Sequence, residues 1–331
     1  MNHDSRVRVG VAGATGYAGV ELLRRLAQHP SADVRVAMGS SNSEARRVPA
    51  LAKIWDSVVQ PFDIDKLSRE SDAIFLAVPE HLSAQIAPGL AARVEKVFDL
   101  SGAFRLRDPE FRHKWYPHSP KVDVPLTYGL TERYRHALPG AKLIACAGCY
   151  PTAAVLALQP LVSRGLIEPG IIVDAKSGVS GAGKTPSERT HFSECYGSIS
   201  AYGVFNHRHG AEIEQEIGVP VTFVPHLVPL DRGIFETIYA RLKPGVSEAA
   251  VGSALEEAYA ASPFVRLTGA SLPEIKHVAH TNFCDIGWKA SGPGGQLVMV
   301  SCIDNLVKGA AGQAIQNFNV AFGFDEATAL N

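Results

Sequence analysis

The sequence predicts an α/β protein built from two domains: a doubly wound parallel sheet, then an α+β domain with a mixed or antiparallel sheet. The length of 331 residues favours two domains. In the first half, short apolar runs alternate with helix-like stretches, which is typical of β-α-β units. After about residue 150, the strand-like runs lengthen and partly alternate with polar residues, as in a mixed sheet.

Apolar runs locate the expected elements. Four strands of the first domain are predicted at residues 7–12, 33–38, 72–79 and 96–101. Helical periodicity over residues 17–29 predicts the first connecting helix, which Pro30 ends. Strands of the second domain are predicted at residues 171–176, 221–224 and 233–242, and residues 304–322 predict an Ala-rich amphipathic helix.

Composition narrows the classes of partner. The formal net charge of −1 argues against a polyanion such as nucleic acid, although a small phosphorylated ligand needs only a local basic cluster. We find no apolar run of the roughly 20 residues that a bilayer span needs, and no secretory signal. A cytoplasmic protein without a membrane or nucleic-acid partner is therefore expected.

A glycine-rich turn follows the first predicted strand. Residues 10–19 (GVAGATGYAG) place glycines where the backbone must approach a pyrophosphate, just before a helix N-terminus. This position predicts a dinucleotide site rather than a merely structural turn. The candidate cofactor residues there are Gly13, Ala14, Thr15, Gly16 and Tyr17.

The end of the second predicted strand indicates which dinucleotide binds. NAD enzymes usually carry an acidic residue at this point for the ribose hydroxyls. Here Ser40 and Ser41 occupy it, and Arg46 and Arg47 follow, a set that suits a 2′-phosphate. NADP is thus favoured over NAD, while solvated loop charges remain the alternative for the two arginines.

The segment 143–154 (LIACAGCYPTAA) carries the chemistry. An apolar strand leads into Gly148 and Cys149, and Pro151 stands in the first turn of a helix, where proline is favoured. Cys149 would then lie at a helix N-terminus, which stabilises a thiolate and makes a nucleophile.

The other cysteines give weaker signals. Five are present, an odd number in a long chain, so a disulfide framework is not expected. Cys146 and Cys149 have C-x-x-C spacing, yet we find no second pair to complete a zinc site, so no metal is predicted. Cys146 falls within the strand, where a cysteine is most often a small buried hydrophobe.

A thiolate chemistry needs an acid/base partner, and the best cluster among the 12 histidines is His207, His209 and Glu212. If the segment is extended, His207 and His209 point to one side. If it is helical, His209 and Glu212 share a face. A surface histidine pair and a metal pair remain alternatives from spacing alone.

These segments together resemble the N-acetyl-gamma-glutamyl-phosphate reductases, within the aspartate-semialdehyde dehydrogenase-like superfamily. The resemblance rests on motifs that occur in order along essentially the whole chain. They are residues 13–19 (GATGYAG), 147–152 (AGCYPT), 177–183 (SGVSGAG), 207–213 (HRHGAEI) and 304–313 (DNLVKGAAGQ).

The resemblance implies a Rossmann domain over residues 1–149, a catalytic and oligomerisation domain over 150–303, and a C-terminal helix over 304–331 that returns to the first domain. It implies NADPH-dependent reduction of an acyl phosphate through a cysteine thioester, with release of inorganic phosphate, in a homotetramer.

Cys149 takes the place of the nucleophile, His209 of the acid/base with His207 a close second, and Glu212 of the accompanying carboxylate. It further implies substrate contacts from Arg105 and Lys184, and cofactor contacts from Ser180, Gly181, Asn305 and Lys308.

Two departures leave alternatives open. Cys146-Ala147 stands where the family usually has Asn-Pro, and Lys184 where it has arginine; lysine can meet a phosphate only as a point charge.

Aminoadipyl or aspartyl phosphate are alternative substrates. A non-catalytic NADP sensor related to short-chain dehydrogenases is an alternative of another class, since Tyr239 and Lys243 match the spacing of their catalytic pair. Those two lie in a strand-like run that ends at Pro244, however, whereas that pair works from a helix.

Overall fold

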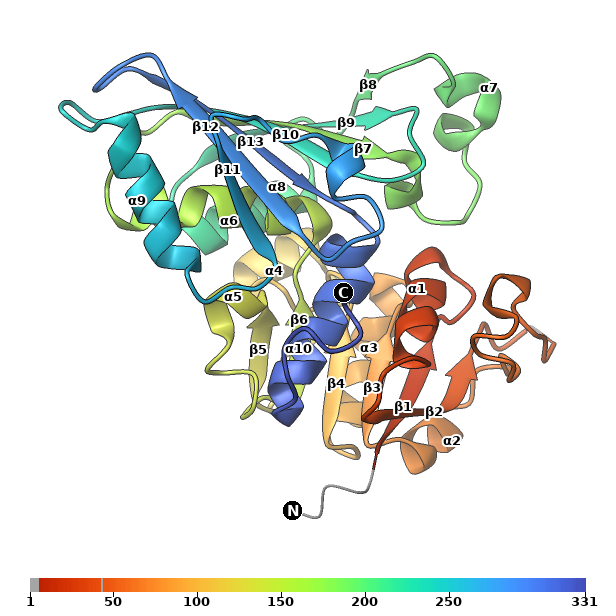
Figure 1. Cartoon of the computed structure of the whole chain (residues 1–331). Coiled ribbons are helices and arrows are strands. Elements are labelled where there is room, and N and C mark those ends of the chain that lie inside the picture. Colours follow the sequence, from red (N-terminus) through yellow and green to blue (C-terminus); the bar gives the residue numbers. More distant parts are fainter. Residues whose placement is uncertain (1–5, 43) are drawn as a thin grey trace. The chain divides into compact units, whose positions relative to one another are not determined.

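The structure is a computed structural model that describes residues 6–42 and 44–331. The chain divides into two compact units, one formed by Met1–Ala147 with Ala310–Asn331 and the other by Gly148–Gly309 (Figure 1). The C-terminal segment thus joins the first unit from residue 310 onward.

The first unit holds a six-stranded parallel sheet with the strand order β2-β1-β3-β4-β6-β5. Its strands are β1 (Val7–Ala12), β2 (Ala32–Met38), β3 (Ala73–Leu76), β4 (Lys96–Asp99), β5 (Leu126–Gly129) and β6 (Leu143–Cys146). The chain goes from β1 outward to β2 and then returns to β3 on the other side of β1. In doubly wound sheets a ligand binds at such a reversal, beyond the carboxyl ends of the strands.

Helices cover both faces of this sheet, because successive side chains of a strand point to opposite sides. The helices of the unit are α1 (Tyr17–Leu26), α2 (Ile64–Glu70), α3 (Glu80–Ala91), α4 (Pro109–Trp115), α5 (Thr131–Tyr134) and α10 (Gly312–Phe322). On one face, Ile74 and Leu76 share an apolar cluster with α2 and α3. On the other, the rings of Phe75 and Phe98 lie 5.8 and 5.9 Å from that of Phe318 in α10.

The C-terminal helix corrects the predicted amphipathic helix over residues 304–322. Helical structure begins with a π-helical segment, η5 (Val307–Ala311), and α10 is buried on every side from Gly312 to Asn319. Several of its amides find partners inside the unit: Asn317, for example, accepts from the Thr131 hydroxyl (2.7 Å) and donates to the Gly129 carbonyl (2.9 Å). Amides that are hydrogen-bonded can be buried. The Asn and Gln residues of this segment therefore suggested an exposed polar face, although they lie in the interior.

The second unit contains a seven-stranded mixed sheet with the order β11-β12-β13-β10-β7-β9-β8, as predicted. The strands are β7 (Ile171–Gly178), β8 (Ser200–Ala201), β9 (Val221–Val228), β10 (Ile234–Arg241), β11 (Val265–Gly269), β12 (Cys284–Ala290) and β13 (Gln296–Ile303), and the helices are α6 (Cys149–Ser163), α7 (Phe192–Cys195), α8 (Arg208–Ile217) and α9 (Glu248–Tyr259). Helix α6 packs on β10 and β13, where the Ser301 hydroxyl donates to the Ala153 carbonyl at 2.9 Å.

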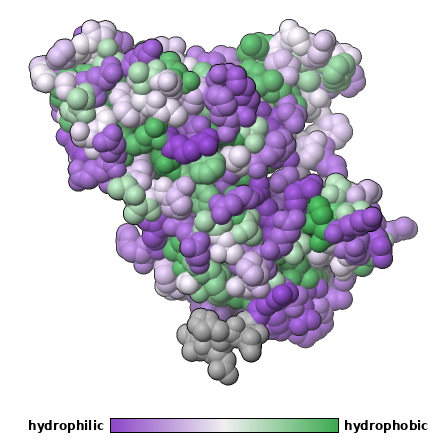
Figure 2. Space-filling model, in the orientation of Figure 1, coloured by the Kyte–Doolittle hydropathy of each residue, from purple (hydrophilic) through white to green (hydrophobic). Residues whose placement is uncertain are grey.

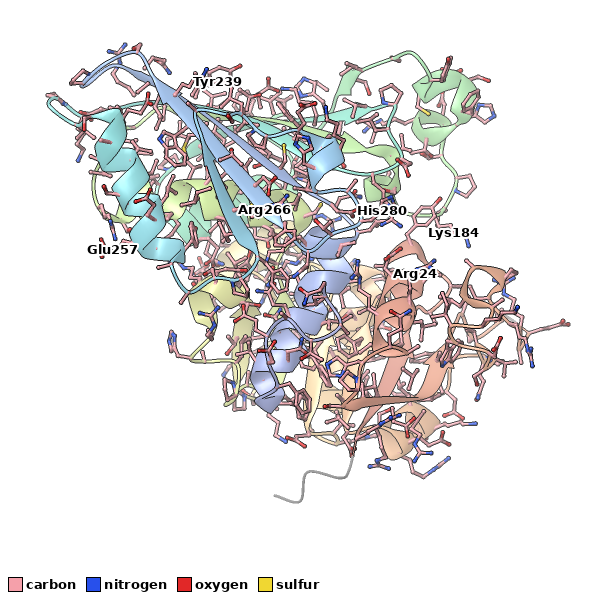
Figure 3. All side chains as sticks on the ribbon, in the orientation of Figure 1. Arg24, Lys184, Tyr239, Glu257, Arg266 and His280 are labelled. Atoms are coloured by element: carbon pink, nitrogen blue, oxygen red, sulfur yellow. The ribbon has the colours of Figure 1, made fainter. Side chains whose placement is uncertain are left out.

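Tyr239 lies on strand β10 (Figure 3), so it is not on the helix that a short-chain dehydrogenase pair requires. All five cysteines are free thiols. Among residues 6–42 and 44–331, we find no helix with the length and apolar character needed to cross a membrane.

Candidate functional site

The glycine turn of the first unit has a conformation that requires glycine. Gly13 has φ of +80°, and a Cβ there would overlap the carbonyl oxygen of Ala77. A Cβ on Gly19 would overlap the carbonyl of Gly13. The N–H groups of Gly13 and Ala14 both donate to the Met38 carbonyl at 2.9 Å, which ties the turn to the end of β2.

Helix α1 begins in this turn, and no acidic side chain of its first turn occupies its N-terminus. Its N-cap, Gly16, provides no side-chain cap, and its first turn contains no acidic residue. The positive end of the helix dipole and its first N–H groups therefore remain suited to a phosphate. Tyr17, the first residue of α1, is exposed beside them. These residues fit the pyrophosphate of a dinucleotide.

The predicted 2′-phosphate residues lie just beyond β2. Ser40, Ser41, Arg46 and Arg47 are all exposed. The backbone of Arg46 pairs with Val59 through two hydrogen bonds of 3.0 and 2.8 Å, which holds this segment in place while its guanidinium faces solvent. Two exposed cations and two exposed hydroxyls within eight residues offer the groups that a phosphomonoester binds.

In the second unit, Cys149 is the first residue of α6, as predicted. The N-cap Gly148 has extended backbone (φ −68°, ψ 156°) and no side chain to cap the helix, and no acidic residue stands in the first turn. The thiol thus lies at the positive end of a helix of 15 residues, which favours its thiolate. Gly309 lies against it, since a Cβ on Gly309 would be 2.7 Å from the Cβ of Cys149.

Glu212 reaches the same helix start from α8. Its side chain is fully buried, and its Oε1 accepts the N–H of Gly148 at 2.8 Å. The carboxylate therefore holds the peptide immediately before the nucleophile. The sequence placed Glu212 beside a histidine; this backbone contact across the unit could not be foreseen from spacing.

His207 and His209 take different positions at the start of α8. His207 is the N-cap residue, and its Nδ1 accepts the N–H of His209 at 3.1 Å. Burial, with a smaller effect from the Arg208 charge, lowers the pKa of His207 to about 4. A neutral imidazole with Nδ1 as acceptor is what this cap requires, because a protonated Nδ1 has no lone pair to accept with.

Tyr150 was missed by the sequence reasoning. Its buried ring meets the imidazoles of His207 and His209 edge-on, with centroids 5.9 and 5.8 Å apart. Its hydroxyl lies 3.2 Å from that of Tyr202 and donates to the His226 carbonyl at 3.2 Å. The ring brings both histidines to the first turn of α6. Its place next to Cys149 was the only available signal.

The remaining predicted residues fall into separate groups. Asn305 joins two distant segments of the second unit: its Nδ2 donates to the Ser180 hydroxyl (2.9 Å) and its Oδ1 accepts from Gly233 (2.7 Å). Gly181 adjoins them, since a Cβ there would lie 3.7 Å from Asn305 Nδ2. Lys308, in contrast, is fully buried, with its Nζ 5.9 Å from the Phe264 ring centre.

The two predicted substrate cations differ in exposure. Lys184 is exposed on the loop that follows β7 in the second unit (Figure 3). Arg105, in the first unit, is buried; its Nε donates to the Cys146 carbonyl (2.7 Å) and its Nη2 to that of Leu100 (2.8 Å). Arg105 therefore holds the end of β6 through hydrogen bonds, three residues before Cys149 in the sequence.

Cys146 has the properties of a structural thiol. It is buried at the end of β6, and burial together with the nearby Asp99 raises its pKa to about 12. Within residues 6–42 and 44–331, we find no group of three or more His, Cys, Asp or Glu side chains arranged to hold a metal ion.

Comparison with known proteins gives a separate family match for each of the two units. The semialdehyde dehydrogenase NAD binding domain matches residues 8–141, and the semialdehyde dehydrogenase dimerisation domain matches residues 149–305. Solved structures share the fold alone. They include aspartate semialdehyde dehydrogenase II from Vibrio cholerae complexed with ASA (TM-score 0.73, 19% identity, 97% of this chain and 99% of that chain). Another is aspartate semialdehyde dehydrogenase with NADP from Candida albicans (TM-score 0.68, 18% identity, 96% and 98%).

Curated relatives are much more similar in sequence. The N-acetyl-gamma-glutamyl-phosphate reductases of Desulforapulum autotrophicum and Brevibacillus brevis are each 44% identical to this chain, over 338 and 339 residues, with 98% of both chains covered. That of Bacillus anthracis is 41% identical over 339 residues with the same coverage. These matches confirm the resemblance drawn from the motifs and identify an oxidoreductase with a nicotinamide-dinucleotide domain. The chain belongs to the N-acetyl-gamma-glutamyl-phosphate reductase family of the semialdehyde dehydrogenases.

Proposed function

We propose that this chain reduces N-acetyl-L-glutamyl 5-phosphate to N-acetyl-L-glutamate 5-semialdehyde with NADPH and releases inorganic phosphate, as a step of arginine biosynthesis. The observation that carries the proposal is Cys149 at the uncapped N-terminus of α6. The names of the relatives that match along 98% of the chain support the choice of substrate.

Cys149 attacks the acyl carbon, so that a C–S bond forms as the C–O bond to phosphate breaks. When bound, NADPH supplies the hydride that converts the resulting thioester to the aldehyde level. The N–H groups at the start of α6 stabilise the oxyanion of each tetrahedral stage. The oxyanion then re-forms the carbonyl as the C–S bond breaks, which releases the aldehyde. The sulfur leaves with a proton from the base and returns it before the next cycle, and the proton that the overall reaction takes up from solvent goes to the released phosphate.

We assign the proton transfer to His209. His207 uses its Nδ1 to cap α8, and its lowered pKa keeps it neutral, which leaves it poorly suited to carry a proton. His209 follows on the first turn of α8, and Tyr150 brings its ring to the start of α6. Glu212 acts through Gly148 as a positioning residue for Cys149.

For the substrate phosphate we propose Lys184, whose exposed ammonium serves as a point charge. We propose that Arg105 acts on the substrate side by holding the end of β6. The glycine turn with Thr15 would hold the pyrophosphate of the cofactor. Ser180, Gly181 and Asn305 are further proposed cofactor contacts. Lys308 is a further proposed cofactor contact, and its side chain is fully buried.

The preference for NADP over NAD is a further part of the proposal, supported by the two exposed arginines after β2. Replacing Arg46 and Arg47 by alanine should weaken NADPH binding at least tenfold and leave NADH binding unchanged. Titration of cofactor fluorescence measures both constants. An equal loss for the two cofactors would show that the arginines do not read the 2′-phosphate.

We also propose a homotetramer that works in the cytoplasm. Self-association is supported by the match of residues 149–305 to a dimerisation domain. A reducing compartment is supported by five free thiols, one of them a nucleophile.

The test is NADP reduction by N-acetylglutamate semialdehyde, with and without inorganic phosphate. We expect phosphate-dependent NADPH formation that Cys149→Ala abolishes and that Cys195→Ala, a matched thiol variant, retains. Phosphate-independent activity would contradict the acyl-phosphate step. Activity only with the aminoadipate or aspartate aldehyde would keep the mechanism and change the substrate, and absence of any activity would favour a sensor.

A further inference from the structure

The proposed substrate carries two anionic groups, and Lys184 is proposed for only one of them, the phosphate. The other is the α-carboxylate of N-acetyl-L-glutamyl 5-phosphate, which three carbon atoms separate from the acyl carbon. A carboxylate that leaves bulk water needs a compensating charge or hydrogen bonds. Arginine matches a carboxylate best, because its planar guanidinium donates two parallel N–H bonds. We therefore expect an arginine close to Cys149.

Exposed cations do not by themselves mark such a site. Figure 2 shows hydrophilic residues at many places on the visible face of the second unit, where solvent screens their charges. Arg232 differs from such residues, because only 16% of its side chain is exposed. A covered guanidinium attracts an anion more strongly, since less solvent screens the charge. The other arginines of the unit are all more exposed; they are Arg164, Arg189, Arg208, Arg241 and Arg266.

The backbone of Arg232 is fixed in the turn between β9 and β10. The Val179 N–H donates to the Leu230 carbonyl at 2.8 Å, which ties this turn to the end of β7. Gly178 lies so close that a Cβ there would be 2.8 Å from the backbone nitrogen of Arg232. The guanidinium therefore extends from a defined position, which lowers the entropic cost of binding a ligand.

Asp304 orients the guanidinium. Its carboxylate is fully buried; Oδ1 accepts the N–H groups of Leu306 and Val307 at 2.8 and 3.0 Å, and Oδ2 accepts that of His280 at 2.7 Å. Nη1 of Arg232 lies 3.5 Å from the same Oδ2. This separation is longer than the roughly 2.7–2.9 Å of a tight charge-assisted pair. Asp304 thus directs a guanidinium, which has several N–H donors, without excluding a second carboxylate.

The same aspartate leads to the nucleophile. Its carbonyl accepts the Gly309 N–H at 2.9 Å, and a Cβ on Gly309 would lie 2.7 Å from the Cβ of Cys149. One short segment thus contacts Arg232 at one end and Cys149 at the other. His280, which Asp304 also holds, has a φ of +66°, a strained conformation for a residue with a Cβ. Backbone strain of this kind concentrates at ligand sites.

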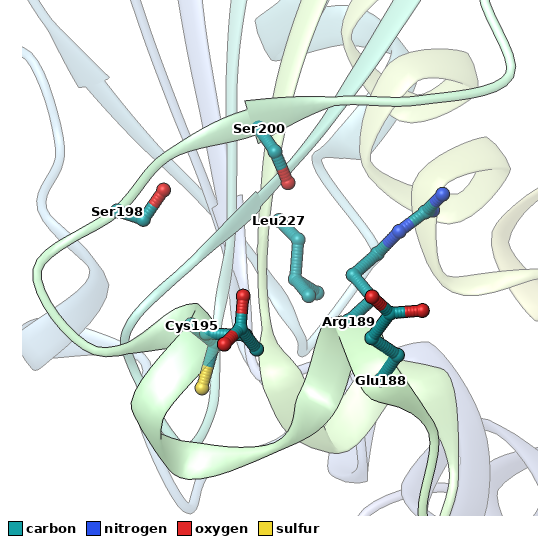
Figure 4. A pocket seen from close by; sticks show the side chains of 7 residues that line it. Glu188, Arg189, Cys195, Ser198, Ser200 and Leu227 are labelled. Atoms are coloured by element: carbon teal, nitrogen blue, oxygen red, sulfur yellow. The ribbon is translucent and has the colours of Figure 1, made fainter.

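A second arginine, Arg189, lines the pocket seen in Figure 4. Two carboxylates, Glu188 and Glu194, line the same pocket and would repel a carboxylate ligand. Arg189 is exposed, with its guanidinium 5.1 Å from the ring centre of Tyr202. It is therefore the less favourable of the two arginines, and it provides a matched control.

We infer that Arg232 is a substrate-binding residue that contacts the α-carboxylate of the substrate, and that Asp304 positions it. The inference rests on the proposed function and adds a determinant of specificity. A substrate without the α-carboxylate forfeits this contact and reacts less efficiently. Because the α-carboxylate is remote from the reacting carbon, the contact is made in the ground state and in the transition state alike. Its loss therefore raises KM more than it lowers kcat.

The test compares two aldehydes in the direction that consumes NADP and phosphate. N-acetylglutamate semialdehyde carries the α-carboxylate, and 4-acetamidobutanal is the same molecule without it. We expect the unaltered enzyme to prefer the former at least tenfold in kcat/KM. Arg232→Gln should raise the KM for N-acetylglutamate semialdehyde at least tenfold, keep its kcat within about threefold and leave the KM for 4-acetamidobutanal unchanged.

Two further variants sharpen the comparison. Arg232→Lys keeps the charge without the planar fork and should give a KM between those of the unaltered enzyme and Arg232→Gln. Arg189→Gln should keep the preference of the unaltered enzyme. Transfer of the effect to Arg189→Gln would place the carboxylate in the other pocket and overturn the inference.

The remaining outcomes separate the inference from the proposed function. Equal losses with both aldehydes would make Arg232 merely structural, and an unchanged preference would show that it does not contact the carboxylate. A raised KM for inorganic phosphate alone would assign Arg232 to the phosphate. Each of these results overturns the inference and leaves the proposed function intact. An unaltered enzyme without phosphate-dependent activity on either aldehyde would overturn both.

A second measurement serves for a variant that lacks activity. N-acetylglutamate and 4-acetamidobutyrate differ by the same carboxylate, and each is expected to protect Cys149 from iodoacetamide by occupying the site. N-acetylglutamate should protect the unaltered enzyme at a concentration at least tenfold lower. Arg232→Gln, with unchanged far-UV circular dichroism, should abolish this difference. Persistence of the difference would contradict the inference.

Discussion

His207 allows the roles of the two histidines to be separated experimentally. In the structure its neutral imidazole caps α8 by accepting the His209 N–H at 3.1 Å. Asparagine is also a good N-cap residue and offers an oxygen acceptor that does not titrate. We therefore expect His207→Asn to preserve α8 and to keep kcat within about tenfold. His209→Asn should lower kcat by about 10²–10⁴-fold, the usual contribution of a general acid/base.

The lowered pKa of His207 also makes the stability of the fold depend on pH. Burial lowers this pKa from the ordinary 6.5 to about 4 in the folded chain. Between pH 4 and pH 6.5, His207 is protonated in the unfolded chain but neutral in the folded chain, so the unfolded chain binds more protons than the folded one. The contribution of the neutral ring to stability is therefore complete above pH 6.5 and is lost as the pH falls toward 4. A full shift of this size corresponds to at most about 3 kcal/mol, and to roughly 2 kcal/mol between pH 7 and pH 5.

Urea unfolding of both proteins at pH 7 and pH 5 measures this contribution. The unaltered chain should lose roughly 2 kcal/mol more than His207→Asn on acidification, because only the former must exclude a proton from the cap. The reasoning would be refuted if both proteins lost the same stability. It would equally be refuted if His207→Asn lowered kcat as far as His209→Asn does, since His207 would then carry the proton.

Three further substitutions test particular contacts. Gly13→Ala would drive a Cβ into the Ala77 carbonyl and should weaken NADPH binding at least tenfold, measured by fluorescence titration; unchanged affinity would contradict the turn assignment. Glu212→Ala leaves the buried Gly148 N–H without its carboxylate and should cost about 1–3 kcal/mol in urea unfolding, whereas Glu212→Gln keeps an acceptor and should recover most of it. Asn317→Ala removes the buried hydrogen bonds to Thr131 and Gly129 and a weak one to the Cys146 sulfur, and should lower the free energy of unfolding by about 2–4 kcal/mol; a loss below 1 kcal/mol would mean that water replaces the amide.

Much of the fold was predictable because its signals are local. The strands β1 and β10 and the start of α6 follow from runs of apolar residues and from proline and glycine at fixed offsets. The C-terminal helix was misjudged for a local reason as well. Its Asn and Gln residues look like a solvent face, and only their partners, such as the Gly129 carbonyl, show that they are buried.

Residue types within short segments were enough to locate two features of the site: the glycine turn that we propose for the dinucleotide, and a cysteine at the start of a helix. Both depend on neighbours within a few residues, where backbone geometry is set by residue type. The tertiary structure alone decided what surrounds them. Glu212 meets Gly148 across 64 residues, and Tyr150 meets both histidines. Such contacts depend on how α8 packs against α6, which no local spacing encodes.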